Sequence, residues 1–438
     1  MQTLDHAHRK SVHLMNDFYF QYNSKNSISW HNWFSSMLRE IPAANFEIQS
    51  NKVEDIQSMR SILKWKYRKN DFYQLESSLG FVQENYQYQD SDVNINTQAN
   101  VTQIPFQCLA SLHFPKQQTL QVELSSAYSF LHSQKQHELT KAGLQLNYEK
   151  SLFKYRLALK TYIQKEVSNL FEIPISSGVQ AVLRLPLQTD LYATISQTNR
   201  TPTLNELYYN PGGNKNLLPE KSNNLEAGTR IHYSKPRTKF NADISGFNRQ
   251  VSNWIVWYGN SILTPHNIGK VQSHGMEAQI NVTYLLSKPA PEVPFEVIIT
   301  TNKSNKKPNT KFMSGLFYAY TIATTQSSLL PNDYSIGKQI PYIPRYQLKW
   351  NSGLQIQQFQ VTGSLAYTGY RFVTTDETQF LKPYTIAQLD MRYKLTFRKM
   401  SHSVNVTISN LLNTHYESII GRVMPGRTFS IGLQTRWN

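Results

Sequence analysis

The chain has 438 residues, of which 39% are hydrophobic and 17% are charged, and its formal net charge at pH 7 is +16. No run of about 18 apolar residues occurs, so a membrane-spanning helix is not expected. Cys108 is the single cysteine, which excludes an intrachain disulfide and a cysteine-based zinc site. We expect it to fill a small apolar position on a strand. Lys and Arg are scattered rather than clustered in a stripe, which favours anionic lipid headgroups or an anionic ligand over nucleic acid.

The N-terminal residues, MQTLDHAHRKSVHLMNDFYF, contain no signal peptide, because the basic residues are followed by no apolar segment. Two interpretations stay open: the protein remains inside the cell, or its true N-terminus lies outside this sequence. The HAH motif at residues 6–8 is interpreted as a frayed terminus rather than a metal site. A strand-like pattern begins almost at once, and we expect residues 10–22 to form the first strand.

Apolar and polar residues alternate in segments along nearly the whole chain. In residues 119–130, apolar side chains share one face, and Gln, Glu and Ser share the other. The same period of two is present in residues 142–149, 153–161 and 275–285, and in the segments FQVTGSLAYTG, AQLDMRYKLTF, SVNVTISN and RTFSIGLQTRW. This period indicates half-buried β-strands. We count about nineteen such segments.

Short and long connections between these segments alternate. The short ones are residues 23–26, 68–70, 115–118, 149–151, 186–189, 234–237 and 398–401. The long ones are residues 39–54, 132–138, 165–177, 199–221, 248–268, 326–342, 371–384 and 413–425. This asymmetry is typical of outer-membrane barrels, which have short turns at one end and long loops at the other. Residues 287–313 fit poorly, and either an elongated turn or an irregular hairpin stays open for them.

Charged side chains occupy the polar faces at strand centres, as at Glu123, Lys154, Arg156 and Glu277. In a wide membrane barrel the apolar face meets lipid and the polar face lines the lumen. Aromatic residues gather near strand ends. We interpret the Trp254–Trp257 stretch as part of an aromatic girdle at the membrane interface rather than as a ligand site.

One long connection carries a recognisable set of motifs. The stretch NRTPTLNELYYNPGGNKNLLPEKSNNLEAGTR resembles a segment of the barrel domain of TonB-dependent outer-membrane receptors. Further segments resemble later barrel strands in the family's order: FNRQVSNWIVW, NIGKVQSHGMEAQ, GKQIPYIPRY, ISNLLNTHY and MPGRTFSIGLQTRW. The resemblance covers roughly residues 25–438, and the motifs are specific through their order rather than singly.

The resemblance implies an all-β fold, a large antiparallel transmembrane β-barrel with about 18–20 strands in this chain, similar to an incomplete 22-stranded barrel. Residues 1–438 are expected to form a single outer-membrane β-barrel domain that lacks the family's N-terminal plug and first strands. The expected location is the outer membrane of a Gram-negative bacterium. The implied partners are outer-membrane lipid, a bulky small-molecule ligand and, only if a plug is supplied elsewhere, the TonB energy complex.

Residues 200–230 are expected to form an ordered loop over the barrel mouth. Thr201–Pro202–Thr203 reads as a helix start, and we expect Glu206, Glu220 and Glu226 to anchor the loop on Arg200, Lys221 or Arg230. Loop architecture is assigned to Pro202, Glu206, Gly213, Asn214, Pro219 and Glu220. Ligand contact is assigned to Tyr208, Tyr209, Arg200 and Asn210, because rigid aromatic side chains bind at low entropic cost.

No catalytic motif, metal-binding pattern or cofactor motif is present in the sequence, so an enzyme is not expected, and no metal or cofactor is assigned. The leading hypothesis is an outer-membrane receptor and transporter for a scarce bulky ligand: a siderophore, haem or cobalamin. Two alternatives stay open. One is a passive channel without a plug, and the other is a surface-binding barrel without transport.

Overall fold

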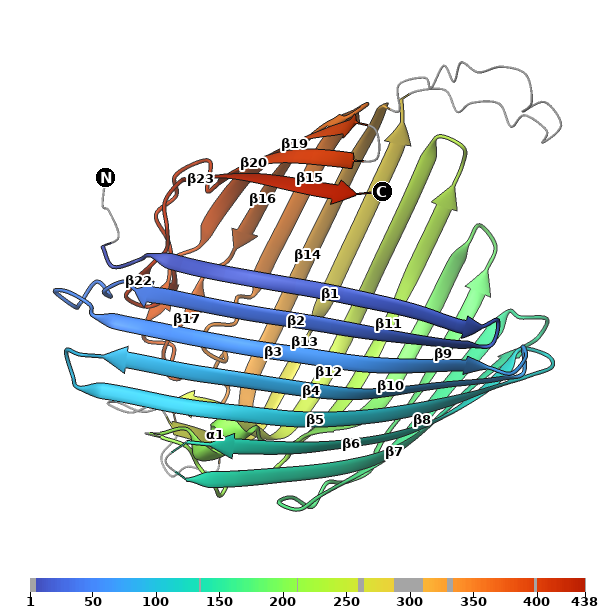
Figure 1. The fold of residues 1–438 in the computed structure, drawn as a ribbon, viewed down its shortest axis with the longest axis horizontal. Helices are drawn as coiled ribbons and strands as arrows, with labels where there is room; N and C mark the ends of the chain where they lie inside the picture. Colours follow the sequence, from blue (N-terminus) through green and yellow to red (C-terminus); the bar gives the residue numbers. More distant parts are fainter. Residues whose placement is uncertain are drawn as a thin grey trace.

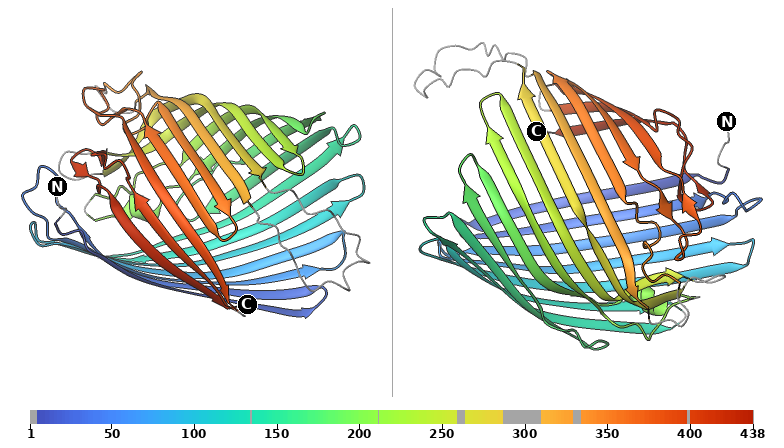
Figure 2. Two further views of the ribbon diagram at one scale, coloured as in Figure 1. Left: turned by 90° about the horizontal axis from the view of Figure 1, so that it is seen from above. Right: turned by 180° about the vertical axis from the view of Figure 1, so that it is seen from behind.

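The computed structural model describes residues 5–133, 135–210, 212–258, 264–286, 310–328, 334–397 and 400–437. Nineteen strands of this part form one antiparallel sheet, and each strand pairs with the next along the chain. The sheet curls about a central space (Figures 1 and 2). The prediction of a large all-β antiparallel fold with about nineteen strands is confirmed.

The strands of the sheet differ in length from 10 to 22 residues. Their bounds are β1 Arg9–Asn23, β2 Asn26–Ile41, β3 Lys52–Arg68, β4 Tyr73–Asp90, β5 Ile95–Phe114, β6 Gln118–His132, β7 Gln136–Leu152, β8 Leu157–Ser168, β9 Ser176–Leu185, β10 Thr189–Arg200, β11 Glu220–Ser234, β12 Thr238–Tyr258, β13 Thr264–Leu285, β14 Thr310–Ser327, β15 Tyr346–Ile356, β16 Phe359–Thr368, β19 Tyr384–Phe397, β20 Met400–Ser409 and β23 Thr428–Trp437.

Three smaller features lie in the connections. Strands β17 (Arg371–Phe372) and β18 (Phe380–Leu381) pair with each other, as do β21 (Glu417–Ile419) and β22 (Arg422–Val423). Helix α1 (Leu204–Tyr208) is the one α-helix in the described residues. The fold therefore has very little helix, as the alternating sequence pattern predicts.

The two faces of the sheet carry different side chains, because successive residues of a strand point to opposite sides. Leu79 of β4 lies opposite Leu63 of β3 and Phe106 of β5, and all three side chains are exposed on the outer face. Buried apolar side chains form small clusters beneath the loops instead of one central core. An exposed apolar face around a polar interior is the arrangement of a membrane barrel.

Alternate connections lie at the same end of the sheet, because every neighbouring pair of strands is antiparallel. The long connections 199–221, 326–342 and 413–425 share one end with α1, and turns such as residues 23–26 lie at the other (Figure 1). The predicted sorting of loop lengths holds for these connections, but the connection from Leu285 to Thr310 lies at the end of the short turns and is long. We call the two ends the loop end and the turn end.

Three predicted connections differ from the structure. Residues 149–151 lie in β7, and the turn follows at residues 153–156, so Lys154 and Arg156 lie in a turn and not at a strand centre. The chain reverses there through positive φ angles at Phe153, Lys154 and Tyr155.

Residues 248–268 are mostly strand, since β12 continues to Tyr258 and β13 begins at Thr264. The strands extend further because Val251, Ile255 and Ile268 are buried there against other side chains. For the segment 287–313, residues 287–309 lie outside the described residues, and Thr310 already begins β14.

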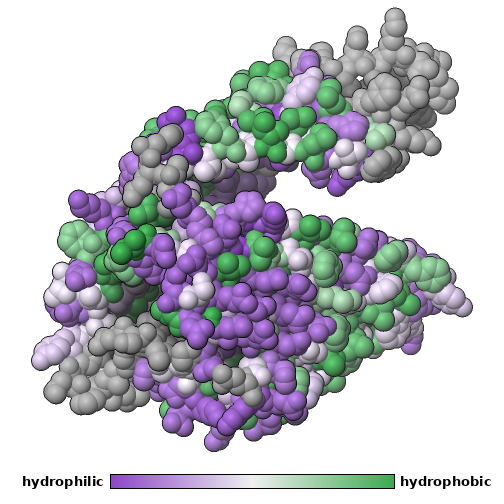
Figure 3. Space-filling model, turned by 60° about the vertical axis from the view of Figure 1, so that its left-hand side comes forward, coloured by the Kyte–Doolittle hydropathy of each residue, from purple (hydrophilic) through white to green (hydrophobic). Residues whose placement is uncertain are grey.

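The first and last strands form two edges of the sheet. Within the described residues, β1 pairs with β2 alone and β23 with β20 alone, and every residue of β1 is exposed. Residues 10–22 thus lie in the first strand, as predicted. Because nineteen strands alternate in direction, β1 and β23 point the same way (Figure 1). A gap separates the parts of the molecule that carry the two edges (Figures 1 and 3).

Contacts between two loops link the two sides of this gap at the loop end. The Asn45 amide N–H donates to the Gly421 carbonyl at 2.8 Å, and Arg422 Nη1 donates to the Pro42 carbonyl at 3.1 Å. Asn45 Nδ2 also donates to Glu417 Oε1 at 3.2 Å. We call these contacts the clasp. They join two loops that are far apart in the sequence and fix their relative position.

Candidate ligand-binding mouth

The connection between β10 and β11 folds inward over the sheet. Thr203 caps α1: its Oγ1 accepts a hydrogen bond from the Glu206 amide at 3.2 Å, and Glu206 Oε2 accepts from the Thr203 amide at 2.8 Å. This reciprocal pair is a capping box, which satisfies two amides at the helix start. Leu204 is buried against Leu131 and Leu139 of the sheet wall. The helix therefore covers the inner face, as expected for an ordered loop.

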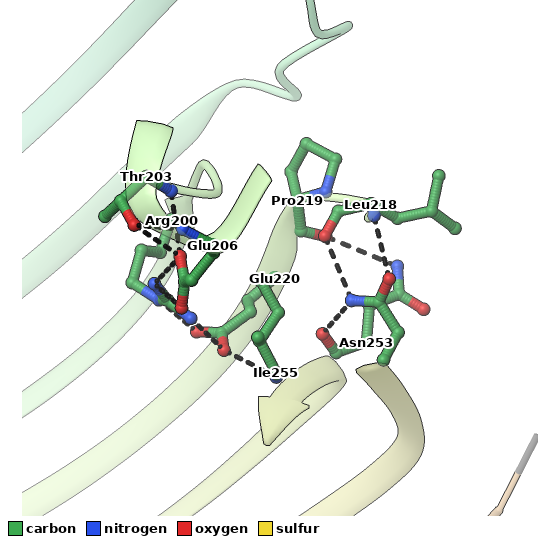
Figure 4. Close-up of polar contacts among 9 residues, drawn as sticks. Arg200, Thr203, Glu206, Leu218, Pro219, Glu220, Asn253 and Ile255 are labelled. Atoms are coloured by element: carbon green, nitrogen blue, oxygen red, sulfur yellow. Dashed lines mark hydrogen bonds and ion pairs between the residues drawn. The ribbon is translucent and has the colours of Figure 1, made fainter. Parts of the chain in front are cut away.

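Arg200 joins the start of the loop to its end (Figure 4). Its Nη1 donates to both carboxylate oxygens of Glu206 at 3.1 Å. Its Nε and Nη2 donate to Glu220 at 2.7 and 2.6 Å. Glu220 Oε1 accepts a further hydrogen bond from the Ile255 amide at 2.8 Å. Paired carboxylates fix a guanidinium in one orientation, so Arg200 serves the architecture of this loop.

The predicted anchors are correct in part. Glu206 and Glu220 both bind Arg200, but Glu226 lies lower on the inner wall, where it accepts a hydrogen bond from Tyr192 Oη at 3.1 Å. Arg230 pairs with Asp243 at 2.9 Å instead of with the loop. The reason is the register of the strands: Glu226 and Arg230 lie within β11, several residues beyond the loop.

Close approach of the backbone requires a glycine at position 213. A Cβ atom on Gly213 would lie 2.6 Å from the Tyr209 nitrogen and 2.7 Å from the Leu207 carbonyl oxygen. The next residue, Asn214, donates through its backbone N–H to the Glu206 carbonyl at 2.9 Å and through Nδ2 to the Pro265 carbonyl at 2.9 Å. The turn after α1 is thereby tied both to the helix and to β13.

Two asparagines of β12 and β13 hold the end of the loop, just before β11 begins. Asn267 Oδ1 accepts from the Leu218 amide at 2.8 Å, and Asn267 Nδ2 donates to the Leu218 carbonyl at 3.1 Å. Asn253 Nδ2 donates to the Pro219 carbonyl at 3.3 Å (Figure 4). Pro202, at the other end of the loop, is almost completely buried. The architectural roles of Pro202 and Pro219 stay predictions.

Two tyrosines follow the helix and reach different parts of the wall. Tyr208 stacks on His137 of β7 with ring centroids 3.6 Å apart, and Lys215 Nζ lies 5.6 Å from the Tyr208 ring centroid. Tyr209 contacts Trp257 of β12 edge-on, with centroids 6.0 Å apart. Both tyrosines are half-buried, and the neighbouring Asn210 is exposed. The loop thus places one aromatic ring against β7 and another against β12.

Tyr86 and Tyr88 of β4 alternate with the outward-facing Asn85 and Gln87, so their side chains point to the same inner face as the mouth loop. Tyrosines of the loop and of β4, together with Trp257, form what we call the mouth cluster: Tyr86, Tyr88, Tyr208, Tyr209 and Trp257. Sequence reasoning did not single out Tyr86, Tyr88 or His137, because they lie in ordinary strand patterns and meet the loop only through its fold.

The interpretation of Trp254–Trp257 as a membrane girdle is wrong. Trp254 packs on a buried cluster that contains Ile268 and Val271, and Trp257 contacts Tyr209. Trp254 thus contacts mainly strand residues of β13 and β14, and Trp257 contacts the mouth loop, so both rings contact protein. Periodicity alone does not distinguish an aromatic residue at a lipid interface from one beneath a loop.

Within the described residues, no group of three or more His, Cys, Asp or Glu side chains is placed to hold a metal ion. In the same part of the chain, no helix has the length and apolar character needed to cross a membrane.

The antiparallel sheet is curled, its outer face is apolar, its inner face is polar, and a folded loop covers one end. These features are those of the wall of a membrane β-barrel. Residues 182–411, more than half of the chain, match the family described as "TonB dependent receptor-like, beta-barrel". The chain belongs to this family, which is one of receptors rather than enzymes.

Curated relatives and solved structures resemble different extents of the chain. The vitamin B12 transporter BtuB of Photobacterium profundum is 23% identical over 223 residues, which are 50% of this chain and 30% of that protein. The BtuB protein of Vibrio vulnificus is 22% identical over 222 residues, 50% of this chain and 29% of that protein. The match thus spans less than a third of these relatives' length.

The structural likeness extends over nearly the whole chain. The ferric citrate transporter FecA in its unliganded form has a TM-score of 0.74 at 11% identity, over 99% of this chain and 71% of that one. The copper transporter OprC has a TM-score of 0.72 at 13% identity, over 98% and 72%. The siderophore receptor PirA from Acinetobacter baumannii has a TM-score of 0.72 at 11% identity, over 98% and 70%. At these identities the likeness shows the fold.

Proposed function

We propose that this chain forms the wall and ligand-capturing mouth of an outer-membrane receptor and transporter for a scarce, bulky ligand. The observation that carries the proposal is the ordered loop, held by Arg200 and Gly213, that places Tyr209 beside Trp257 and Tyr208 on His137 over the inner face. Rigid aromatic side chains supply contact area at small entropic cost.

The charges beside the mouth cluster favour a ligand with anionic groups. Lys215 lies over the Tyr208 ring, and Lys135 and Lys215 both act electrostatically on His137. A cation-bearing aromatic surface complements the carboxylate or catecholate groups of a ferric siderophore. Cobalamin is the second candidate, because the aligned vitamin B12 transporters match half of this chain.

Transport requires further parts. We propose that a plug supplied outside the described residues fills the lumen, and that the TonB energy complex acts through that plug. Unpaired sheet edges are not tolerated in lipid, so the gap between β1 and β23 must be closed. Since β1 and β23 run parallel, an all-antiparallel closure takes an odd number of additional strands.

Equilibrium binding to the folded chain in detergent micelles tests the proposed function. The probes are ferric enterobactin, ferric citrate, haem and cyanocobalamin, each measured by quenching of tryptophan fluorescence. We expect one of these probes to bind and Tyr209→Ala to weaken that binding about tenfold, the effect of removing a central aromatic contact. The control is Tyr393→Ala, at the turn end, which should bind as the wild type.

Two outcomes would contradict the proposal. One is the absence of binding for all four probes, and the other is equal binding by the wild type and Tyr209→Ala. Ion conductance in planar bilayers that no probe blocks would favour a passive channel instead.

A further inference from the structure

The outer face of the sheet changes its chemistry between the two ends. On β3–β6 the outward positions toward the turn end are apolar, and those toward the loop end carry mainly amides. The change is abrupt: outward-facing Gln57 of β3 is followed on the same face by Met59, about 7 Å farther along the strand. Figure 3 shows hydrophilic side chains gathered toward the loop end and hydrophobic ones toward the turn end.

A hollow of about 370 Å³ lies in this amide-rich area, a volume within the about 300–1,000 Å³ of small-molecule sites. Strand register places its side chains on one face, because Asp55 lies opposite Gln87 and Gln87 opposite Gln98. The adjacent row runs through Gln57, Asn85, Asn100 and His132. These seven residues line the hollow together with Tyr86, Ala99 and Ser133, which are their neighbours along the chain. We call the seven the outer amide site.

The side chains of the outer amide site and those of the mouth cluster lie on opposite faces of the sheet, although Tyr86 of the mouth cluster lies between Asn85 and Gln87 in β4. The mouth loop packs on Ala99 and Val101 of β5, whereas Gln98 and Asn100 alternate with these residues and point to the opposite side of the sheet. A ligand in the lumen does not reach the outer amide site. Its occupant must approach from the membrane side.

We propose that the outer amide site binds the uncharged saccharide headgroup of a glycolipid in the surrounding leaflet. Amide groups donate and accept hydrogen bonds at once, which matches the hydroxyl groups of a sugar ring. A phosphate headgroup requires cations, but the lining residues include the carboxylate of Asp55 and no Lys or Arg. The apolar band that begins at Met59 sets the hollow at headgroup level and leaves room for the acyl chains below.

The test uses the full chain in nanodiscs of phosphatidylcholine that contain small, equal fractions of digalactosyl diacylglycerol and phosphatidylglycerol. Native mass spectrometry measures which lipids stay bound when the disc is removed. We expect the galactolipid to be retained several-fold above its share of the disc. The double variant Asn85→Ala/Gln87→Ala should lower the retained galactolipid to about its share of the disc, because hydrogen bonds from two amides are lost.

The matched control is Gln103→Ala, an amide on the inner face of β5, which should retain the galactolipid as the wild type does. Retention of phosphatidylglycerol in place of the galactolipid would overturn the proposal, as would equal enrichment in the double variant. Soluble raffinose, tested by saturation-transfer NMR, separates a free sugar from a headgroup: binding of raffinose without galactolipid enrichment would also overturn it. If the double variant does not insert, Gln57→Ala provides the same comparison.

Discussion

The phenol ring of Tyr208 lies flat on the imidazole of His137, with 3.6 Å between ring centroids and 6° between ring planes. The two residues are 71 positions apart in the chain, on the mouth loop and on strand β7. The contact fixes the loop against the wall at a point away from its Arg200 anchor. A loop held at both places presents Tyr209 in one defined position, which is the condition for a preorganised binding surface.

Substitution of Arg200 by Gln should loosen the mouth loop without unfolding the sheet. The change removes the charge-assisted hydrogen bonds to Glu206 and Glu220, which are worth about 1–3 kcal/mol when buried and toward the lower end here because Arg200 is half-exposed. Hydrogen exchange of the Leu207 and Tyr209 amides should become faster. Arg156→Gln, in a turn at the other end, is the control. Unchanged exchange in Arg200→Gln would contradict the assigned anchor.

The Gly213→Ala variant should disorder the same loop by a steric route. The added Cβ would lie 2.6–2.7 Å from backbone atoms of Leu207, Tyr208 and Tyr209, and backbone cannot move aside as a flexible side chain does. Trypsin cleavage after Lys215 reports the loss of order. Gly363→Ala has no atom within 4 Å of the added Cβ and should leave cleavage unchanged. Equal cleavage of both variants would show that the turn tolerates a side chain.

Acidification should open the clasp. Burial opposes ionisation of Glu47, but hydrogen bonds from Lys52 and the Ala44 amide outweigh it and lower the pKa of Glu47 below the ordinary value of 4.5. A lowered folded-state pKa means that the ionised carboxylate stabilises this loop above pH 4.5, and that the stabilisation is lost as the pH falls through the folded-state pKa. Protection of the Asn45 amide, corrected for intrinsic exchange rates, should be constant above pH 4.5 and fall on further acidification.

The Glu47→Gln variant supplies the comparison for this pH effect. It removes the titrating group, so protection of the Asn45 amide should already be low at pH 6 and change little on acidification. A pH response in Glu47→Gln equal to that of the wild type would assign the effect to another group.

The edges of the sheet should stay apart in the membrane. In a Cys108→Ser background, we expect no disulfide between cysteines at positions 14 and 431 on β1 and β23. The matched pair at positions 406 and 431, which lie opposite each other on β20 and β23, should cross-link readily. Efficient cross-linking of positions 14 and 431 would mean that the barrel closes directly through a parallel pair.

Much of the fold could be predicted from the sequence, because strand alternation is a local property. The period of two in residues 119–130 reappears as β6, and the order of short and long connections fixes the two ends. The site was predicted less completely. Arg200 and Glu206 lie within one sequence motif, so their contact could be predicted. The contacts Tyr208–His137 and Tyr209–Trp257 depend on the path of the loop, which the periodicity of the sequence does not predict.

The same limit explains the errors. Glu226 is close in sequence to the mouth loop, but the pleat of β11 places it beside Tyr192 on the wall. Trp254 and Trp257 read as lipid-facing because aromatic residues favour interfaces, yet residues of β13 and β14 and the mouth loop contact them. Both errors came from assigning a side chain to a partner before the arrangement of the loops was known.

The most direct test of the central claim is the environment of successive residues along β10 in a lipid bilayer. Oxygen concentrates in lipid and increases the relaxation rate of a spin label that it reaches. It should do so for labels at positions 191, 193 and 195, because Leu191 and Ile195 are exposed on the outer face. A water-soluble nickel complex should increase the relaxation rate of labels at positions 190 and 194, since these positions face the lumen. A regular alternation is the predicted result. Uniform access of the nickel complex to all five positions would contradict a sheet with one face in lipid and one face lining the binding space.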